Sequence, residues 1–376
     1  MSYAVDRSGH ETVNVRAIES LASSYYGKKM NFHRSEKINF KSSVDVSRAW
    51  LVDHDRKGIT VIAKHHNNNI PKYILPYFNE ETLNYNFLMS IRDEFDKFPK
   101  LYGNNQCLFV LEDLGKTSQN FKNEMEIMES IARTFSDLHK STFDKKNLYE
   151  ISRTYHEIKD DLRDFSNNGQ HDQFIQGANI LANYVEITTK HSMSRFIKFA
   201  MPILEDIRFP GHFESFIHGD MICARQSVYV DGVVKLLDFE HGRFAHSLID
   251  LAVFLIGKIE INTNIDKLHY SHINLSAQLA AIYRKMIQEK SGRVISDTIW
   301  NRNLASCFFF QAIILIKTTE MTVGKKKFTS DMIHTLKLII DRLLECLVDI
   351  PAHLELQSML KDFLGKLGSG PIKLLV

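Results

Sequence analysis

Two aspartates near the middle of the chain are spaced so that they could act together. Asp220 and Asp238 each follow a short apolar, strand-like run, and the pair Asp231-Gly232 between them is a strong signal for a tight hairpin turn. Because a hairpin folds its two ends back together, the eighteen residues between the aspartates (238 − 220) can bring both carboxylates to one cleft. Two neighbouring carboxylates can bind Mg²⁺ with a polyphosphate, or one can act as a base while the other binds the metal.

The motifs around these aspartates resemble those of a known family. His218-Gly219-Asp220 resembles the catalytic loop, and Asp238-Phe239-Glu240 the metal loop, of the aminoglycoside phosphotransferase and choline kinase-like family. Its members are small-molecule relatives of the protein kinases. Asp250-Leu251-Ala252 resembles the segment that follows in that family, and the similarity spans roughly residues 38 to 255.

The resemblance implies a role for each motif. Asp220 would accept or orient the proton of a substrate hydroxyl, and Asp238 would hold the Mg²⁺ that bridges two phosphates. His218 would pack and hydrogen-bond the loop backbone, and Asp250 would brace the catalytic loop. Glu240 is equally consistent with a second metal contact and with a polar strand end.

The first half of the chain contains a matching set of nucleotide-binding motifs. "VIAK", which ends at Lys64, resembles the strand whose lysine reaches the phosphates of ATP or GTP. Glu81 is the best candidate to hold this lysine, with Glu80 one residue away. The segment from Glu112 to Leu114 resembles the crossover that presents backbone groups to the base.

The sequence departs from the family pattern at two places. Where the family has an asparagine for the second metal ion, this chain has Arg225, which cannot bind a cation, followed by Gln226, which can. Either the loop is one residue longer and Gln226 is the ligand, or a ligand has been lost and Gln226 only begins a strand. In addition, no glycine-rich loop precedes Lys64. The phosphates would then be held by backbone N–H groups and the hydroxyls of Ser42, Ser43 or Ser47.

Hydrophobic periodicity predicts the elements that would position these residues. The fold class is α+β: a two-lobed, protein-kinase-like fold with a small β-rich N-lobe over residues 1–115 and a large, mainly helical C-lobe over 116–376. The C-lobe would contain the catalytic and metal loops at 216–242 and the substrate pocket. The remaining expectations are a hairpin within 37–66, a helix after Pro76, strands within 97–103 and 107–115, a helix over 126–140, helices over 148–207 broken by a loop at 166–173, strands between 216 and 239, and helices from 249 to 365.

Composition excludes several other classes of protein. Lys plus Arg number 47 against 45 Asp plus Glu, a balance of +2 that demands neither nucleic acid nor an anionic membrane as a partner. The first twenty residues lack the apolar core of a secretion signal, and the apolar run from Phe308 to Ile316 is interrupted and too short to span a bilayer. The four cysteines are scattered, which suits a reducing compartment. We therefore expect a cytoplasmic protein, and its oligomeric state stays open.

Three functions are weighed against these motifs. The first is an ATP- or GTP-dependent phosphotransferase that uses Mg²⁺ and acts on a hydroxyl of a small molecule such as an antibiotic, an amino alcohol or a sugar. The alternative is a catalytically inactive kinase-like protein that binds nucleotide or serves as a scaffold. Against it, the chain retains Lys64, Asp220 and Asp238. Protein kinase activity is weaker still, because the glycine of the D-F-G motif is absent. The remaining histidines, among them His65, His66 and His139, are interpreted as surface or packing residues.

Overall fold

The computed structural model describes residues 3–5, 11–39, 44–66, 75–105, 108–115, 124–155, 169–220, 226–230, 232–260, 278–289, 292, 294–323 and 351–367. The chain divides into two compact units. The first unit comprises residues 1–122, 148–158 and 226–241, and the second comprises 123–147, 159–225 and 242–376. The predicted metal loop thus groups with the N-terminal residues, and the predicted catalytic loop groups with the helical part of the chain.

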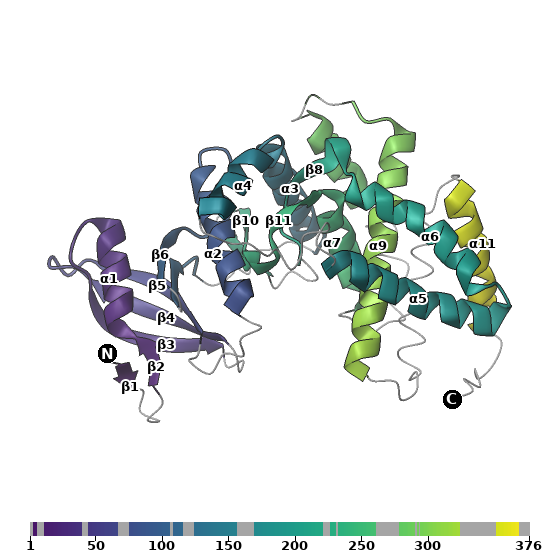
Figure 1. Ribbon diagram of the computed structural model, residues 1–376. Helices are drawn as coiled ribbons and strands as arrows, with labels where there is room; N and C mark the ends of the chain where they lie inside the picture. The colour runs from purple at the N-terminus through teal and green to yellow at the C-terminus, as the bar shows by residue number, and fades with distance from the viewer. Residues whose placement is uncertain are drawn as a thin grey trace. The chain divides into compact units, whose positions relative to one another are not determined.

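The first unit is built on a five-stranded antiparallel sheet (Figure 1). Its strands lie in the order β3-β4-β5-β7-β6. Their bounds are β3 (Asn31–Asn39), β4 (Val44–Val52), β5 (Gly58–His66), β6 (Leu101–Asn105) and β7 (Leu108–Glu112). The predicted hairpin is confirmed as β4 and β5, which pair from Val44↔His66 to Val52↔Gly58. The analysis of the sequence missed β3, because few of its residues are apolar.

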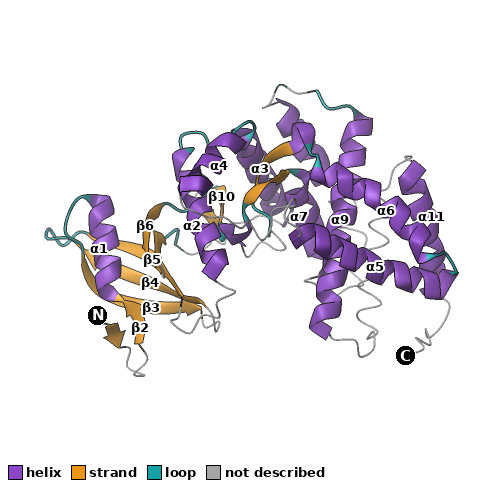
Figure 2. Ribbon diagram, in the orientation of Figure 1, coloured by secondary structure: helices purple, strands orange, loops and turns teal. Residues whose placement is uncertain are grey.

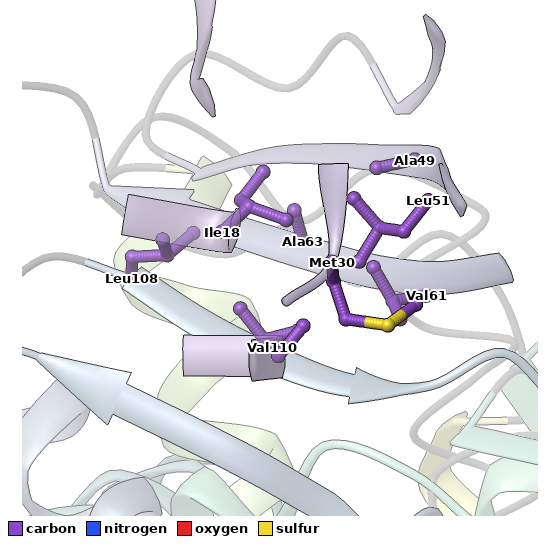
Figure 3. Close-up of a cluster of buried hydrophobic side chains, with 9 residues drawn as sticks. Ile18, Met30, Ala49, Leu51, Val61, Ala63, Leu108 and Val110 are labelled. Carbon is purple, nitrogen blue, oxygen red and sulfur yellow. The ribbon is translucent and has the colours of Figure 1, made fainter. Parts of the chain in front are cut away.

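One face of the sheet is covered by an apolar layer, and side chains that alternate along a strand point either into this layer or away from it. Helix α1 (Val15–Tyr26) contributes Ile18 and Ala22, which pack with buried residues of the sheet (Figure 3). The buried partners drawn from the strands and the segment before β3 are Met30, Ala49, Leu51, Val61, Ala63, Leu108 and Val110. Because side chains alternate along a strand, Lys64 projects from the opposite face to its neighbour Ala63.

The first unit also contains helices and a hairpin outside this sheet. They are α2 (Leu75–Ser90), most of α4 (Lys146–Tyr155), the strands β9 (Ser227–Val230) and β10 (Val233–Leu236), and the 3₁₀ helix η4 (Phe239–His241). The pairing Val233↔Val230 leaves two residues in the turn, so the hairpin predicted from Asp231-Gly232 is confirmed, although Asp231 itself lies outside the described residues. A short pair of strands, β1 (Tyr3–Val5) and β2 (Glu11–Asn14), precedes α1.

The second unit is mainly helical (Figure 2). Its labelled helices are α3 (Glu124–Thr142), α5 (Gly169–Thr189), α6 (Met193–Arg208), η2 (Gly211–Phe213), α7 (Leu248–Glu260), α9 (Asp297–Val323) and α11 (Pro351–Leu367). A further helix covers residues 278–289. The loop predicted at 166–173 is wrong from Gly169 onward, because α5 begins there. Its polar first turn is followed by the buried Phe174, Ala178 and Leu181 at helical spacing.

One small sheet in the second unit positions the catalytic loop. The first of the strands predicted between 216 and 239 is found as β8 (Glu214–Ile217), which begins two residues earlier and leads directly into His218. It pairs with β11 (Arg243–His246), a strand that the sequence did not reveal. Helix α9 packs against α5, α6 and α7, α5 also packs against α6, and Phe174 stacks on Phe310 between α5 and α9. None of the helices that the structure describes is long and apolar enough to cross a membrane.

Candidate functional site

Three charged side chains meet on the face of the sheet opposite α1. The Nζ atom of Lys64 lies 2.9 and 2.7 Å from the two carboxylate oxygens of Glu81 and 3.1 Å from Oδ1 of Asp238. We call these three residues the lysine cluster. The sequence predicted that Glu81 and not Glu80 would pair with Lys64, and the structure has this contact. Glu80 instead lies 3.5 Å from Nη1 of Arg153 in α4.

Burial and charge act against each other in the lysine cluster. Burial favours an uncharged Lys64, but the carboxylates of Glu81, Asp238 and Glu240 together raise its pKa above the usual value, so it stays protonated. Burial also raises the pKa of Glu81 to about 7, and the charges of Asp238 and Glu240 add to this effect while Lys64 opposes it. The cluster therefore contains more negative charge than Lys64 alone can balance.

Asp238 differs from its two partners because its side chain is 53% exposed, whereas those of Lys64 and Glu81 are 9% and 1% exposed. Its backbone is in the left-handed region at φ 56°, a conformation that aspartate tolerates better than most residues. The carbonyl of Gln226 accepts a hydrogen bond from the backbone N–H of Leu237, at 2.8 Å. The hairpin therefore brings Gln226 beside the residue that precedes Asp238.

Helix α2 holds the predicted metal loop with one face. Glu81, Asn84 and Tyr85 follow the i, i+3, i+4 spacing of a single helical face. The Tyr85 ring meets the ring of Phe239 edge to face at 5.7 Å, and the amide of Asn84 donates to the carbonyl of Phe239 at 2.6 Å. The analysis of the sequence did not identify Asn84 or Tyr85. Their spacing from Glu81 was the available signal.

The segment after β7 is fixed by ionic and backbone contacts. Glu112 makes two hydrogen bonds with the Lys100 backbone: its N–H donates to the Lys100 carbonyl at 2.8 Å, and its side-chain carboxylate accepts from the Lys100 N–H at 3.1 Å. The next residue, Asp113, binds the guanidinium of Arg48 through both carboxylate oxygens, at 2.6 and 3.2 Å. Arg48 holds the pKa of Asp113 below its usual value despite partial burial. Leu114, the third residue of the segment, is half-buried.

A second cluster in the second unit is built around Asp250 of α7. The carboxylate of Asp250 accepts hydrogen bonds from the backbone N–H groups of His218 and Gly219, both at 2.7 Å, and lies 3.0 Å from Nε2 of His139. Nδ1 of His139 lies 2.6 Å from the hydroxyl of Tyr283. We call Asp250, His139 and Tyr283 the aspartate cluster. It fixes Gly219 at φ 81°, which is accessible to glycine without strain.

The aspartate cluster changes the interpretation of His139. The sequence predicted a surface or packing residue. His139 is fully buried, which agrees with packing, and it also contacts polar groups through both ring nitrogens. Burial alone would raise the pKa of Asp250, but the hydrogen bonds from His139 and from the Gly219 backbone hold it below its usual value. The expected bracing role of Asp250 therefore has a direct geometric basis.

The predicted catalytic residue lies at the end of the braced segment. Asp220 follows Gly219, is half-buried, and donates its backbone N–H to Nδ1 of His218 at 3.4 Å. His218 itself is fully buried. Two other predicted positions, Ser43 and Arg225, lie outside the described residues, as does Ser42. Ser47, the third hydroxyl considered for phosphate, is buried within β4.

No protein-family model and no curated protein sequence matches the chain. Solved structures do match it. A candidate aminoglycoside phosphotransferase from Ralstonia eutropha is 15% identical with a TM-score of 0.52, and the match covers 94% of this chain and 98% of that one. An ethanolamine kinase from Plasmodium vivax is 11% identical with a TM-score of 0.50, covering 82% of each chain. A macrolide 2′-phosphotransferase from Brachybacterium faecium is also 11% identical with a TM-score of 0.50, covering 86% of this chain and 97% of that one.

These similarities establish the fold. The antiparallel N-terminal sheet and the largely helical remainder are those of the kinase-like small-molecule phosphotransferases, so the predicted fold class and the predicted resemblance are confirmed. Identity of 15% or less carries no information on the acceptor.

Proposed function

We propose that the protein transfers the γ-phosphate of ATP or GTP to a hydroxyl group of a small molecule. The observation that carries this proposal is the lysine cluster. A buried lysine is held by a buried glutamate, and a half-exposed aspartate lies on a loop beside them. This combination can bind the phosphates and the metal ion of a nucleotide with separate groups.

The charge around Lys64 fits a divalent cation. Glu81, Asp238 and Glu240 would carry three negative charges against one positive charge when all are ionised, a balance of −2. Hard carboxylate oxygens are the ligands that Mg²⁺ prefers, and the amide oxygen of Gln226 is a ligand of the same kind. Asp238 and Gln226 are therefore the residues that we propose would hold the metal. Bound there, Mg²⁺ would neutralise charge on the nucleotide phosphates.

Each remaining residue has one task in this proposal. Lys64 binds phosphate oxygens through its ammonium group, and Glu81 keeps that group in place. Asp220 takes or orients the proton of the acceptor hydroxyl, because a carboxylate is the weak base that proton transfer of this kind requires. For the nucleotide, we propose phosphate contacts at Ser43 and contacts to the base from the backbone between Glu112 and Leu114.

Titration calorimetry of the purified protein with ATP and with GTP, each with and without Mg²⁺, tests this proposal. We expect Mg²⁺ to strengthen the binding of one of the nucleotides, and we expect Asp238→Ala to remove this Mg²⁺-dependent part. Asp55→Ala is the matched control, because the Asp55 side chain is 58% exposed and lies in the β4–β5 turn of the same unit. Failure of both nucleotides to bind would favour the inactive kinase-like alternative. Equal Mg²⁺-ATP affinity in wild type and Asp238→Ala would remove Asp238 from the site.

The acceptor is sought by nucleotide consumption once binding is established. Amino alcohols, macrolides and sugar-like antibiotics form the first panel, since the similar structures carry the names of enzymes for such molecules. With an acceptor in hand, Asp220→Asn should lower turnover by about 100- to 10,000-fold and leave nucleotide affinity unchanged. Turnover within a few fold of wild type would show that Asp220 is not the base.

A further inference from the structure

The metal loop is held by a hydrogen-bonded chain of two residues that the phosphotransfer scheme does not use. The hydroxyl of Tyr149 in α4 donates to Oδ1 of Asn84 in α2 at 3.0 Å. The amide of Asn84 in turn donates to the carbonyl of Phe239 at 2.6 Å. Asn84 is 0% exposed and Tyr149 1% exposed, so water does not compete for either contact. This series of hydrogen bonds ends at Phe239, the residue that follows Asp238.

The chemistry of the three groups determines which atom donates and which accepts in these hydrogen bonds. The Phe239 carbonyl can only accept a hydrogen bond, so the NH₂ group of Asn84 must face it and Oδ1 must face the other way. The Tyr149 hydroxyl then donates to that oxygen. Turning the amide over would place two acceptors against each other at Phe239. Tyr149 thus stabilises the one orientation in which Asn84 can hold the loop.

The loop needs such support because of its backbone. Asp238 has a φ of 56°, a region that aspartate tolerates better than most residues but that still carries a conformational cost, which the surroundings must offset. The carbonyl of the next residue, Phe239, accepts a hydrogen bond from Asn84, and the ring of Phe239 is buried against Tyr85. Holding Phe239 on both sides prevents the Asp238 backbone from relaxing, and it leaves the Asp238 carboxylate beside Lys64.

We infer that Asn84 and Tyr149 are positioning residues that set the affinity of the Asp238 loop for Mg²⁺-nucleotide. This inference rests on the proposed function, because it assigns to α2 and α4 the control of the metal ligand named there. Asn84 holds the loop, and Tyr149 acts through Asn84. Neither residue touches the nucleotide in this scheme, so their loss should affect the metal-dependent part of binding alone.

The first arm of the test measures ATP affinity against Mg²⁺ concentration. The measured quantity is the Mg²⁺ concentration at which half of the Mg²⁺-dependent gain in ATP affinity is reached. Asn84→Ala should raise this concentration about 5- to 30-fold and Tyr149→Phe about 2- to 5-fold, with ATP affinity in the absence of Mg²⁺ unchanged. Because Tyr149 acts through Asn84, Tyr149→Phe should add nothing in the Asn84→Ala background. Ser23→Ala is the control, since it removes a hydrogen bond of the same unit, from Met30 N–H at 2.9 Å, on the other face of the sheet.

The second arm measures hydrogen exchange of the backbone amides from Leu237 to His241 without nucleotide. Exchange there should accelerate in Asn84→Ala and Tyr149→Phe and not in Ser23→Ala. This arm does not depend on the proposed function. If wild type shows no Mg²⁺-dependent ATP binding, the proposed function fails, and exchange still decides whether Asn84 holds the loop.

Unchanged amide hydrogen exchange in both variants would overturn the inference, whatever the result of the nucleotide-binding measurements. Accelerated exchange with an unchanged Mg²⁺ requirement would also overturn it, because the loop would then be held for a reason other than metal binding. Additive effects of the two substitutions would show that Tyr149 does not act through Asn84. If Asn84→Ala does not fold, Tyr149→Phe alone decides the matter, because it removes a single oxygen atom.

Discussion

The lysine cluster and the aspartate cluster are both built on buried carboxylates, yet they balance charge in different ways. In the first unit, Lys64 faces several carboxylates, and one of them, Asp238, is half-exposed. In the second unit, the carboxylate of Asp250 accepts from two backbone N–H groups and contacts His139, with no exposure at all. The first cluster has surplus negative charge, whereas the second has its charge balanced by donors.

This difference indicates different tasks. A group that exchanges its partner for a ligand must reach solvent and must gain from the ligand's charge, which is the task that we propose for the half-exposed Asp238. A group that only holds backbone in place is best served by complete burial and fixed donors, because every lost hydrogen bond is then costly. Asp250 meets this second description. Substitutions in the two clusters should therefore separate binding from stability.

The largest expected effect is on stability, at Asp250. Asp250→Ala leaves the N–H groups of His218 and Gly219 and the ring of His139 without their acceptor, and should lower the free energy of unfolding by about 3–5 kcal/mol. Urea titration in a Trp50→Phe background measures this, because the chain has two tryptophans and Trp300 then reports the second unit alone.

The matched variant in the other cluster is Asp238→Ala. The Asp238 side chain is 53% exposed, and Lys64 retains its contact with Glu81 in the variant. The free energy of unfolding should therefore change by less than about 1 kcal/mol. Trp50 fluorescence in a Trp300→Phe background reports that change. Similar losses in the two variants would break the comparison, since both carboxylates would then serve the fold.

The second prediction concerns pH and Glu81. Its pKa in the folded chain is raised to about 7 from 4.5, so the folded state binds this proton more tightly than the unfolded state does. The resulting stabilisation is present below pH 4.5 and is lost as the pH rises through 7. Between pH 4 and pH 8, wild type should lose about 3 kcal/mol of unfolding free energy relative to Glu81→Gln. Urea titrations of both proteins, followed by Trp50, measure this difference.

The opposite slope would contradict the surplus of negative charge. If wild type gained stability relative to Glu81→Gln as the pH rose, attraction to Lys64 would outweigh burial and the neighbouring carboxylates. Asp45→Asn is a control for titration elsewhere in the unit, because the Asp45 side chain is 19% exposed and pairs with Lys37 at 2.5 Å, within the sheet.

Much of the fold could be predicted from the sequence because its signals are local. The β4–β5 hairpin alternates around a polar turn, and the β9–β10 hairpin is announced by Asp231-Gly232. Strands β3 and β11 were missed because each is defined by its partner, β4 or β8, rather than by its own residues. The start of α5 was missed because glycine and polar residues occupy its first turn, where tertiary packing outweighs propensity.

The candidate site divides along the same line. Lys64, Glu81, Asp220 and Asp238 were predicted as site residues because their order along the chain resembles that of a known family. Tyr149 and Tyr283 were missed because each contacts a residue at least 65 positions away, and no local pattern encodes such a contact. Asn84 was missed although its spacing from Glu81 places both residues on one helical face. For His139 the sequence predicted a surface or packing residue, and the packing alternative agrees with its burial; its contact with Asp250 was missed because that partner lies 111 positions further along.

The last expected effect, smaller than that at Glu81, reverses the pH slope in the second unit. Burial lowers the pKa of His246 to about 4 from 6.5. The neutral ring donates through Nε2 to Asn303 at 2.8 Å and accepts the Leu248 N–H at Nδ1 at 3.3 Å. This stabilisation is present above pH 6.5 and is lost as the pH falls towards 4. Between pH 8 and pH 5, wild type should therefore lose about 2 kcal/mol of unfolding free energy relative to His246→Gln. Trp300 fluorescence reports this loss. Glu81 stabilises the first unit at low pH and His246 the second at high pH, so parallel slopes in the two single-tryptophan chains would mean that one of these two environments has been misassigned.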